Sequence, residues 1–140
     1  MVTGAGGREL GFSVAGSFDA VLVDVPCSCE GNVRKDSVAL LKAVDKAELL
    51  VRQQELLRSG WEAVRPGGWL VYSTCTFDVE ENEEQVERFL RAVEAVEVDV
   101  GSYLEGVVSG RHGAQLWPQS MDVEGFFVCR GTGWLALFRA

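Results

Sequence analysis

The sequence predicts an α/β domain built around a parallel β-sheet. Two short apolar stretches, 18–23 and 69–73, have the composition of buried strands, and the segment 38–64 between them carries apolar residues at helical spacing. A strand, a helix and a second strand within about 55 residues form a βαβ unit, whose strands run parallel. The chain has 140 residues, 47% of them apolar, which suffices for one compact domain with its own core.

Local signals set the boundaries of these elements. Residues 3–17 are rich in Gly and Ser and are predicted to form a loop. The stretch 18–23 is nearly all apolar, as expected of a strand covered on both faces, and ends at Asp24. The helical segment is predicted to be one long helix or two helices broken near Asp45. It is expected to stop at Arg-Pro-Gly-Gly, residues 65–68.

The second half of the chain predicts a helix followed by three strands. Asp78 is a suitable N-cap for an acidic helix, and Glu81 follows three residues later, as in a capping box. The segment 96–100 alternates between apolar and acidic residues, which is typical of a strand. Two more strands are predicted at 114–117 and 126–130.

Composition and charge exclude several classes of protein. The chain is acidic, with 13 Lys and Arg against 21 Asp and Glu and a formal charge of −8. A broad basic surface for nucleic acid is therefore excluded, and any such contact must be local. There is no run of about 18 apolar residues and no signal-peptide pattern at the N-terminus. We therefore expect a cytoplasmic protein with no membrane association and with reduced cysteines.

Two of the four cysteines follow the ends of predicted strands. Cys27 comes shortly after Asp24, and Cys75 comes directly after the second strand. Ligands of open α/β sheets bind outside the carboxyl ends of the strands, so these three residues are expected to line one crevice. The N-terminus of the following helix favours a thiolate at Cys75, which makes it the better candidate nucleophile. From these residues alone, two small buried thiols and an Asp that caps a loop remain the simpler interpretation.

The remaining residues of interest are assigned more ordinary roles. Cys29 stands at C-x-C spacing from Cys27, and the chain has one His, so a structural zinc site is not expected. A thiol redox protein is a weaker alternative, because no C-x-x-C pair is present. His112 lies in a polar loop and is expected at the surface.

The sequence neighbours of each tryptophan predict whether it is buried or contacts a substrate. Trp61 and Trp69 stand among apolar residues and are expected in the core. Trp117 is the candidate for stacking on a substrate.

Several motifs occur in an order that is typical of one enzyme family. They are Phe-Asp-Ala-Val-Leu-Val-Asp-Val-Pro-Cys-Ser-Cys-Glu-Gly at 18–31, Arg-Lys-Asp at 34–36, Arg-Pro-Gly-Gly at 65–68, Tyr-Ser-Thr-Cys-Thr at 72–76, Glu-Asn-Glu at 81–83, Trp-Pro-Gln at 117–119, Asp122 and Glu-Gly-Phe-Phe at 124–127. Over about residues 18–130 the chain closely resembles the Sun-type RNA 5-methylcytosine methyltransferases, particularly their bacterial ribosomal RNA branch. The resemblance implies a Rossmann-like, S-adenosylmethionine-dependent methyltransferase sheet.

The resemblance also implies roles for five residues. In this family a thiolate adds to carbon 6 of cytosine, and carbon 5 then takes the methyl group of S-adenosylmethionine, which splits one difficult step into easier ones. The thiolate corresponds to Cys75, and Cys27 corresponds to the cysteine that assists removal of the carbon 5 proton and release of RNA. Asp24 corresponds to the residue that holds the base edge near the cofactor's sulfonium. Arg34 and Lys35 correspond to residues that contact RNA phosphate or the target base. Without the resemblance, two adjacent basic residues more commonly belong to a solvated loop.

The chain also departs from the family pattern. Cys29 stands where the family usually has Gly, and Gly6 stands where an Asp usually contacts the adenosine. The glycine-rich cofactor loop, the acidic residue that binds the ribose, the first strands and the RNA-binding region have no counterpart before the first cysteine motif. We therefore expect a sheet that is incomplete at its N-terminal half: a loop remnant at 1–17, the C-terminal part of the catalytic domain at 18–130, and a tail at 131–140.

Two hypotheses about function follow. The first is S-adenosylmethionine-dependent methylation of carbon 5 of cytosine in RNA, with ribosomal RNA as the expected substrate. The second is an inactive fragment, which serves as an interaction module or needs a partner chain to supply the cofactor-binding half.

Overall fold

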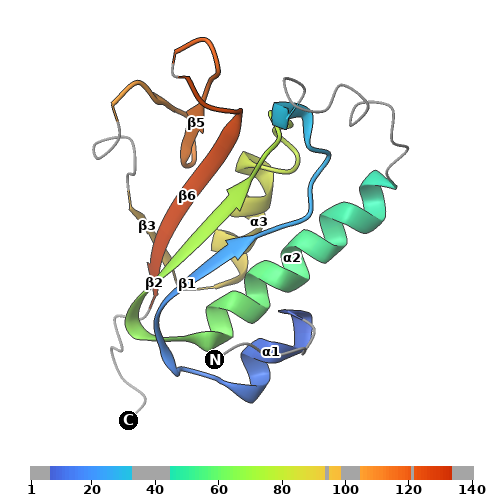
Figure 1. Ribbon diagram of the computed structural model, residues 1–140. Coiled ribbons are helices and arrows are strands. Elements are labelled where there is room, and N and C mark those ends of the chain that lie inside the picture. Colours follow the sequence, from blue (N-terminus) through green and yellow to red (C-terminus); the bar gives the residue numbers. More distant parts are fainter. Residues whose placement is uncertain (1–6, 33–44, 94, 99–104, 121, 134–140) are drawn as a thin grey trace.

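The computed structural model describes residues 7–32, 45–93, 95–98, 105–120 and 122–133. Its core is a six-stranded mixed sheet in the order β1-β2-β6-β5-β4, with β3 paired to β6 (Figure 1). The strands are β1 (Phe18–Asp24), β2 (Val64–Thr74), β3 (Ala95–Val98), β4 (Val108–Ser109), β5 (Ala114–Leu116) and β6 (Phe126–Gly133). The helices are α1 (Gly7–Ser13), the short 3-10 helix η1 (Glu30–Asn32), α2 (Lys46–Ala63) and α3 (Glu83–Ala92).

The βαβ unit predicted from the sequence is present. β1 and β2 run parallel, with Val21 opposite Leu70, and α2 connects them on one face of the sheet. Gly60 of α2 lies so close to the sheet that a Cβ there would be 2.4 Å from a methyl carbon of Val23. Leu57 is buried beside it. This close helix–sheet contact aligns the carboxyl ends of β1 and β2.

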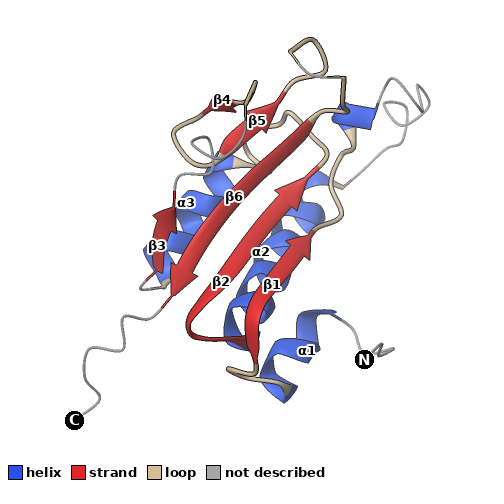
Figure 2. Ribbon diagram, turned by 60° about the vertical axis from the view of Figure 1, so that its left-hand side comes forward, coloured by secondary structure: helices blue, strands red, loops and turns tan. Residues whose placement is uncertain are grey.

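The second half of the chain joins the sheet in the antiparallel direction. β6 pairs with β2 along its length, and β3, β5 and the short β4 follow outward. Phe127 of β6 is fully buried and lies edge-on to Tyr72 of β2, with ring centroids 6.3 Å apart. α3 completes the core on the same face as α2, where Phe89 meets Trp61 (Figure 2).

Two predictions about the first half were wrong. Residues 7–13 form a helix, not a loop, because tertiary contacts compensate for their low helix propensity: the N–H of Gly11 donates to Ser59 of α2, whose hydroxyl donates to the carbonyl of Gly7. β2 begins at Val64, not at 69. Residues 65–68 form an irregularity in the pairing with β1, which the left-handed conformation of Gly67 allows.

β1 is far more exposed than its composition suggests. Helices cover one face of the sheet among the described residues, so alternate β1 side chains face outward, and Leu22 is 67% exposed. Trp69 lies on the same open face at 39% exposure, with the Arg130 guanidinium 4.4 Å from its ring centroid. Trp69 is therefore not a core residue, whereas Trp61 is, at 6% exposure.

The predicted cap of the acidic helix was also wrong. Asp78 accepts the N–H of Glu80 and caps a separate turn, and α3 starts only at Glu83 with Asn82 as its N-cap residue. The predicted strands at 96–100, 114–117 and 126–130 correspond to β3, β5 and β6, while β4 was not predicted. No helix in the described part of the chain combines the length and apolarity needed to span a membrane.

Candidate active site

Three thiols meet where β1 and β2 end. Cys27 follows β1 and Cys75 follows β2, and their Sγ atoms are 3.2 Å apart. Cys29 Sγ lies 4.0 Å from Cys27 Sγ, and all three sulfur atoms are within 4.8 Å of one another. Figure 1 shows β1 and β2 side by side with their arrowheads pointing toward the same edge of the sheet. All three thiols are free and partly buried, and they form one cluster.

Hydrogen bonding makes Cys27 the most acidic of these thiols. Its sulfur accepts the peptide N–H of Cys75 at 3.3 Å, and the Cys75 thiol donates to the same sulfur. The hydrogen bond from the Cys75 thiol lowers the pKa of Cys27 to about 7. The same contact raises the pKa of Cys75, and burial raises the pKa of Cys29. The hydrogen bonds therefore favour the thiolate form at Cys27 over Cys75.

The sequence argument for a thiolate at Cys75 was wrong. It relied on a helix N-terminus directly after Cys75, but α3 begins at Glu83 and a turn lies between them. The premise of that argument, a helix that starts directly after Cys75, therefore does not hold. The available donor to Cys75 is Asn32, whose Nδ2 lies 3.4 Å from the Cys75 Sγ.

Alkylation of the reduced, chelator-treated chain checks this order of acidity. We expect iodoacetamide to label Cys27 before Cys75, with a rate that rises as the pH increases through about 7, because the thiolate is the reactive form. In Cys75→Ala the donating thiol is gone, so the midpoint for Cys27 should move to higher pH. Peptide mass spectrometry reports both rates, and earlier labelling of Cys75 would contradict the assignment.

A buried carboxylate holds the loop that carries Cys27. Glu81 is fully buried, and its Oε2 accepts the N–H of Ser28 at 3.1 Å and Nε2 of Gln53 at 2.8 Å. The same Gln53 nitrogen reaches the carbonyl of Pro26 at 3.0 Å. The Tyr72 hydroxyl donates to the backbone carbonyl of Glu81 at 2.7 Å. The sequence suggested a capping role for Glu81, and nothing in an acidic run distinguishes the one member that is buried.

A second buried network holds the turn that carries Cys75. The Thr74 hydroxyl donates to Oδ1 of Asn82 at 2.6 Å, and Nδ2 of Asn82 donates to the carbonyl of Thr76 at 3.0 Å. Thr74, Thr76 and Asn82 are all fully buried. The residues on both sides of Cys75 are thus fixed, which fixes the position of its sulfur.

Gly31 is the point where three backbone segments meet. Its N–H donates to the carbonyl of Cys75 at 2.9 Å, and its carbonyl accepts the N–H of Gly125 at 3.2 Å. A Cβ at position 31 would lie 2.2 Å from the carbonyl oxygen of Gly125 and 2.9 Å from that of Cys75. Only a glycine fits there without moving backbone.

Gly31→Ala is expected to destabilise the chain by about 1–3 kcal/mol, because the new methyl overlaps two carbonyl oxygens. Urea unfolding followed by circular dichroism measures the loss. Gly110→Ala is the matched control, since a Cβ there meets first the flexible end of Glu83 at 3.0 Å. Its expected change is within about 0.5 kcal/mol. Equal stability of the two variants would show that the segments meeting at Gly31 are free to separate.

The other candidate residues are placed differently. Asp24 is exposed at the end of β1, where its carboxylate accepts the hydroxyl of Ser73 at 2.9 Å. Arg34 and Lys35 lie outside the described residues.

Two predicted surface or substrate residues pack against neighbours. Trp117 stacks on Phe77, with ring centroids 4.6 Å apart and planes 2° from parallel, so one face of its ring is covered. His112 was expected at the surface, but its side chain is 19% exposed and its Nδ1 lies 2.6 Å from Oε2 of Glu97. It connects the loop before β5 to β3.

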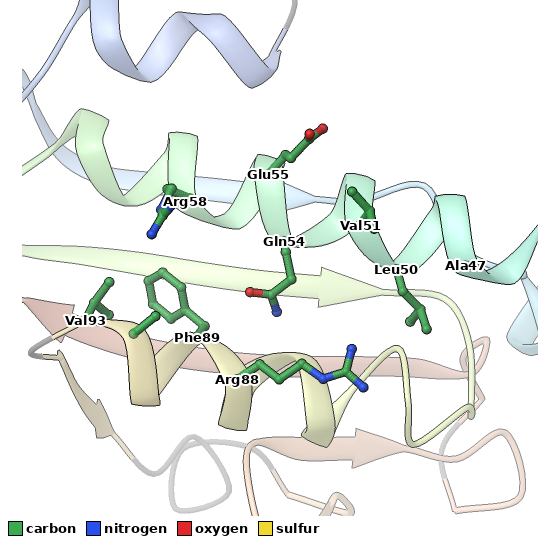
Figure 3. Close-up of a pocket in the computed structure, with 10 residues that line it drawn as sticks. Ala47, Leu50, Val51, Gln54, Glu55, Arg58, Arg88, Phe89 and Val93 are labelled. Atoms are coloured by element: carbon green, nitrogen blue, oxygen red, sulfur yellow. The ribbon is translucent and has the colours of Figure 1, made fainter.

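A separate groove runs between α2 and α3 (Figure 3). Its lining includes Leu50, Val51, Gln54, Arg58, Arg88 and Phe89. None of the three clustered cysteines lines it. It lies in the helical layer and contributes no group to the thiol site.

Solved structures share the fold of this chain. The crystal structure of PH0851 superposes with a TM-score of 0.81 at 28% identity, covering 90% of this chain and 29% of that one. NSun6 from Pyrococcus horikoshii, solved with SFG, superposes with a TM-score of 0.69 at 22% identity, covering 94% of this chain and 34% of that one, and so shares the fold. The sheet therefore has the α/β fold of these solved structures, of which the chain covers about a third or less.

Sequence comparison specifies the family. The family model described as 16S rRNA methyltransferase RsmB/F matches residues 2–130. Ribosomal RNA small subunit methyltransferase F of Klebsiella pneumoniae (strain 342) is 43% identical over 131 residues, which cover 89% of this chain and 28% of that protein. The chain belongs to the 16S rRNA methyltransferase RsmB/F family, which confirms the resemblance seen in its motifs. It spans little more than a quarter of the length of the curated relatives it matches.

Proposed function

We propose that the protein containing this chain methylates carbon 5 of a cytosine in ribosomal RNA, with S-adenosylmethionine as the methyl donor. The observation that carries the proposal is the 3.2 Å contact between Cys27 and Cys75 at the carboxyl ends of two parallel strands. Ligands of α/β sheets bind at such ends, and a pair of thiols that share one proton is suited to covalent catalysis. Membership in a ribosomal RNA methyltransferase family supports the RNA substrate.

In the proposed mechanism Cys75 is the nucleophile. As its sulfur bonds to carbon 6 of cytosine, its proton passes to the Cys27 thiolate 3.2 Å away. The electron pair of the ring double bond moves to make carbon 5 nucleophilic, and carbon 5 takes up the methyl group. Cys27 then loses its proton to water and accepts the proton of carbon 5, so that the ring double bond re-forms. The bond between Cys75 and carbon 6 breaks with its electrons returning to sulfur.

Among the described residues, Asp24 is the one whose charge suits the cofactor. S-adenosylmethionine supplies an electrophilic methyl group on a positively charged sulfur when it is bound. Asp24 has an exposed carboxylate at the carboxyl end of β1, which suits a positive charge beside the thiols. A groove along β1, lined in part by Phe18, Leu22 and Asp24, lies at the edge of the sheet where no described strand pairs with β1. We infer that the cofactor-binding strands of the complete domain pair there.

The remaining assignments complete the proposal. Arg34 and Lys35 contact RNA phosphate or the target base, Asp24 holds the base edge, and residues 18–130 form the C-terminal part of the catalytic domain. The compartment is the cytoplasm, where ribosomal RNA of the bacterial relatives is found. The alternative, a fragment that is inactive until a partner chain supplies the cofactor-binding half, is supported by the same unpaired edge of β1.

A chimera tests the proposal. This chain would replace the matching segment of the Klebsiella pneumoniae relative, and methyl transfer from labelled S-adenosylmethionine to small-subunit RNA would be measured. We expect the chimera to label cytosine at carbon 5, which digestion and mass spectrometry identify. The 140-residue chain alone should bind no cofactor in calorimetry. A folded chimera that binds cofactor and methylates no cytosine would overturn the proposal.

A further inference from the structure

We propose that Cys27, Cys29 and Cys75 form a binding site for a thiophilic metal ion of the zinc class. The site has a regulatory consequence, which rests on the proposed function. A bound ion occupies the thiols of Cys27 and Cys75 and stops methyl transfer until it is removed. Zinc was not expected from the sequence, because Cys27 and Cys29 stand at C-x-C spacing and the chain has one His. The third ligand comes instead from the end of another strand, far along the chain.

The backbone at Cys29 supports a role for its thiol. Cys29 has φ of 62°, the one left-handed conformation of a residue other than glycine among the described residues. Such a conformation is strained for a residue that has a Cβ, and glycine avoids the strain. Cys29 therefore bears a backbone strain that a glycine would remove. Strain of this kind persists where the side chain has a function.

The distances suit coordination by sulfur. Zinc binds thiolates at about 2.3 Å, so two sulfurs on a tetrahedral zinc lie about 3.8 Å apart. The Cys27–Cys29 distance is 4.0 Å and the Cys27–Cys75 distance is 3.2 Å, with all three atoms inside 4.8 Å. Opening the closest pair by about half an ångström makes room for the ion at its usual bond length. A fourth position is left for water.

The surroundings include buried acceptor atoms without a hydrogen-bond partner among the described residues. Glu81 is fully buried, and its Oε1 has no hydrogen-bond partner among the described residues, while its Oε2 binds the N–H of Ser28 within the thiol loop. Oδ1 of Asn32 is likewise buried without a partner, and its Nδ2 contacts Cys75. Buried acceptors beside three thiols favour a positively charged occupant.

Cobalt and zinc titrations of the 140-residue chain test the site directly. Co²⁺ added to the reduced chain should produce sulfur-to-cobalt charge-transfer bands and the visible bands of a tetrahedral ion, saturating at one equivalent, and Zn²⁺ should displace it. Competition with a chromophoric chelator then measures the zinc affinity. The sulfur-to-cobalt charge-transfer bands grow with the number of thiolates on the ion, so their intensity separates this site from weak surface binding.

Two variants make the test specific. Cys29→Gly removes the third thiol and the backbone strain together, so it should fold at least as well and bind zinc at least about tenfold more weakly. Cys129→Ala removes a cysteine that is buried outside the cluster and should bind zinc like the parent chain. Equal zinc affinity in Cys29→Gly and the parent, or loss of the cobalt bands in Cys129→Ala, would overturn the proposed site.

Experiments on both the 140-residue chain and the chimera test zinc inhibition and the proposed methyl transfer separately. If the chain binds zinc and the chimera methylates RNA, zinc should inhibit the chimera and a chelator should restore its rate. Zinc binding by the chain with an inactive chimera would retain the metal site and remove the methyltransferase proposal. An active chimera that zinc does not inhibit, with no cobalt bands in the chain, would remove the metal site and retain the methyltransferase.

Discussion

Cys75→Ala is expected to abolish methyl transfer by the chimera, lowering the rate by at least about 10³-fold, because no sulfur remains to add to carbon 6. It should also form no covalent complex with RNA. Cys27→Ala should lose turnover to a similar extent but retain a covalent protein–RNA complex, because the nucleophile is present and the group that removes the carbon 5 proton is not. Denaturing electrophoresis with labelled RNA separates the two outcomes.

The matched control for these variants is Cys129→Ala, which removes a thiol buried against the core. It should keep the methylation rate and form no trapped complex. The experiment also decides between the two cysteines. A trapped complex in Cys75→Ala and none in Cys27→Ala would make Cys27 the nucleophile, in keeping with its lower pKa in the resting cluster.

Glu81→Ala is expected to lower the free energy of unfolding by about 3 kcal/mol or more. It removes the buried carboxylate that accepts the Ser28 N–H and one N–H of the Gln53 side chain. The loop that carries Cys27 then loses a fixed contact to the turn after β2. Urea unfolding measures the stability. The rate of Cys27 alkylation at neutral pH should fall as well, because its sulfur no longer stays in reach of the Cys75 thiol and N–H.

Glu80→Ala is the control for this prediction, since it changes the neighbouring residue of the same type. The Glu80 side chain is 50% exposed and pairs with Lys46 at 3.2 Å. An exposed ion pair contributes about 1 kcal/mol or less. If Glu80→Ala and Glu81→Ala were equally stable, the buried network would not hold the loop. Glu81→Gln should be intermediate, because it keeps one oxygen acceptor in the same volume.

Predictions from local sequence patterns were confirmed where the spacing of apolar residues was enough to identify a helix or a strand. The β1–α2–β2 unit, β3, β5 and β6 were all predicted from apolar spacing and from residues that stop helices. Cysteine motifs at two strand ends, in the order seen in the Sun-type family, indicated where the site would lie. These features depend on short segments, so the sequence alone contains them.

The errors have one physical cause, which is that distant contacts overrode local preference. Gly7 and Gly11 are poor helix formers, yet Ser59 of α2 holds their segment as α1. Asp78 has the residue type of an N-cap but caps a turn, and Trp69 lies among apolar neighbours but on the open face of the sheet. Each of these results depends on which other segment of the chain packs against the residue.

The sequence by itself determined the family, the α/β class and the two cysteines at strand ends, because each is encoded in contiguous motifs and their order. Only the tertiary structure decided that Cys29 joins the pair, that Cys27 carries the lower pKa, and that Glu81 is buried beneath the loop. These properties depend on contacts that the folded chain makes, such as the 3.2 Å contact between Cys27 and Cys75, which are 48 residues apart in the sequence. Hydrogen bonding and burial act at that range, and no local pattern of residues records them.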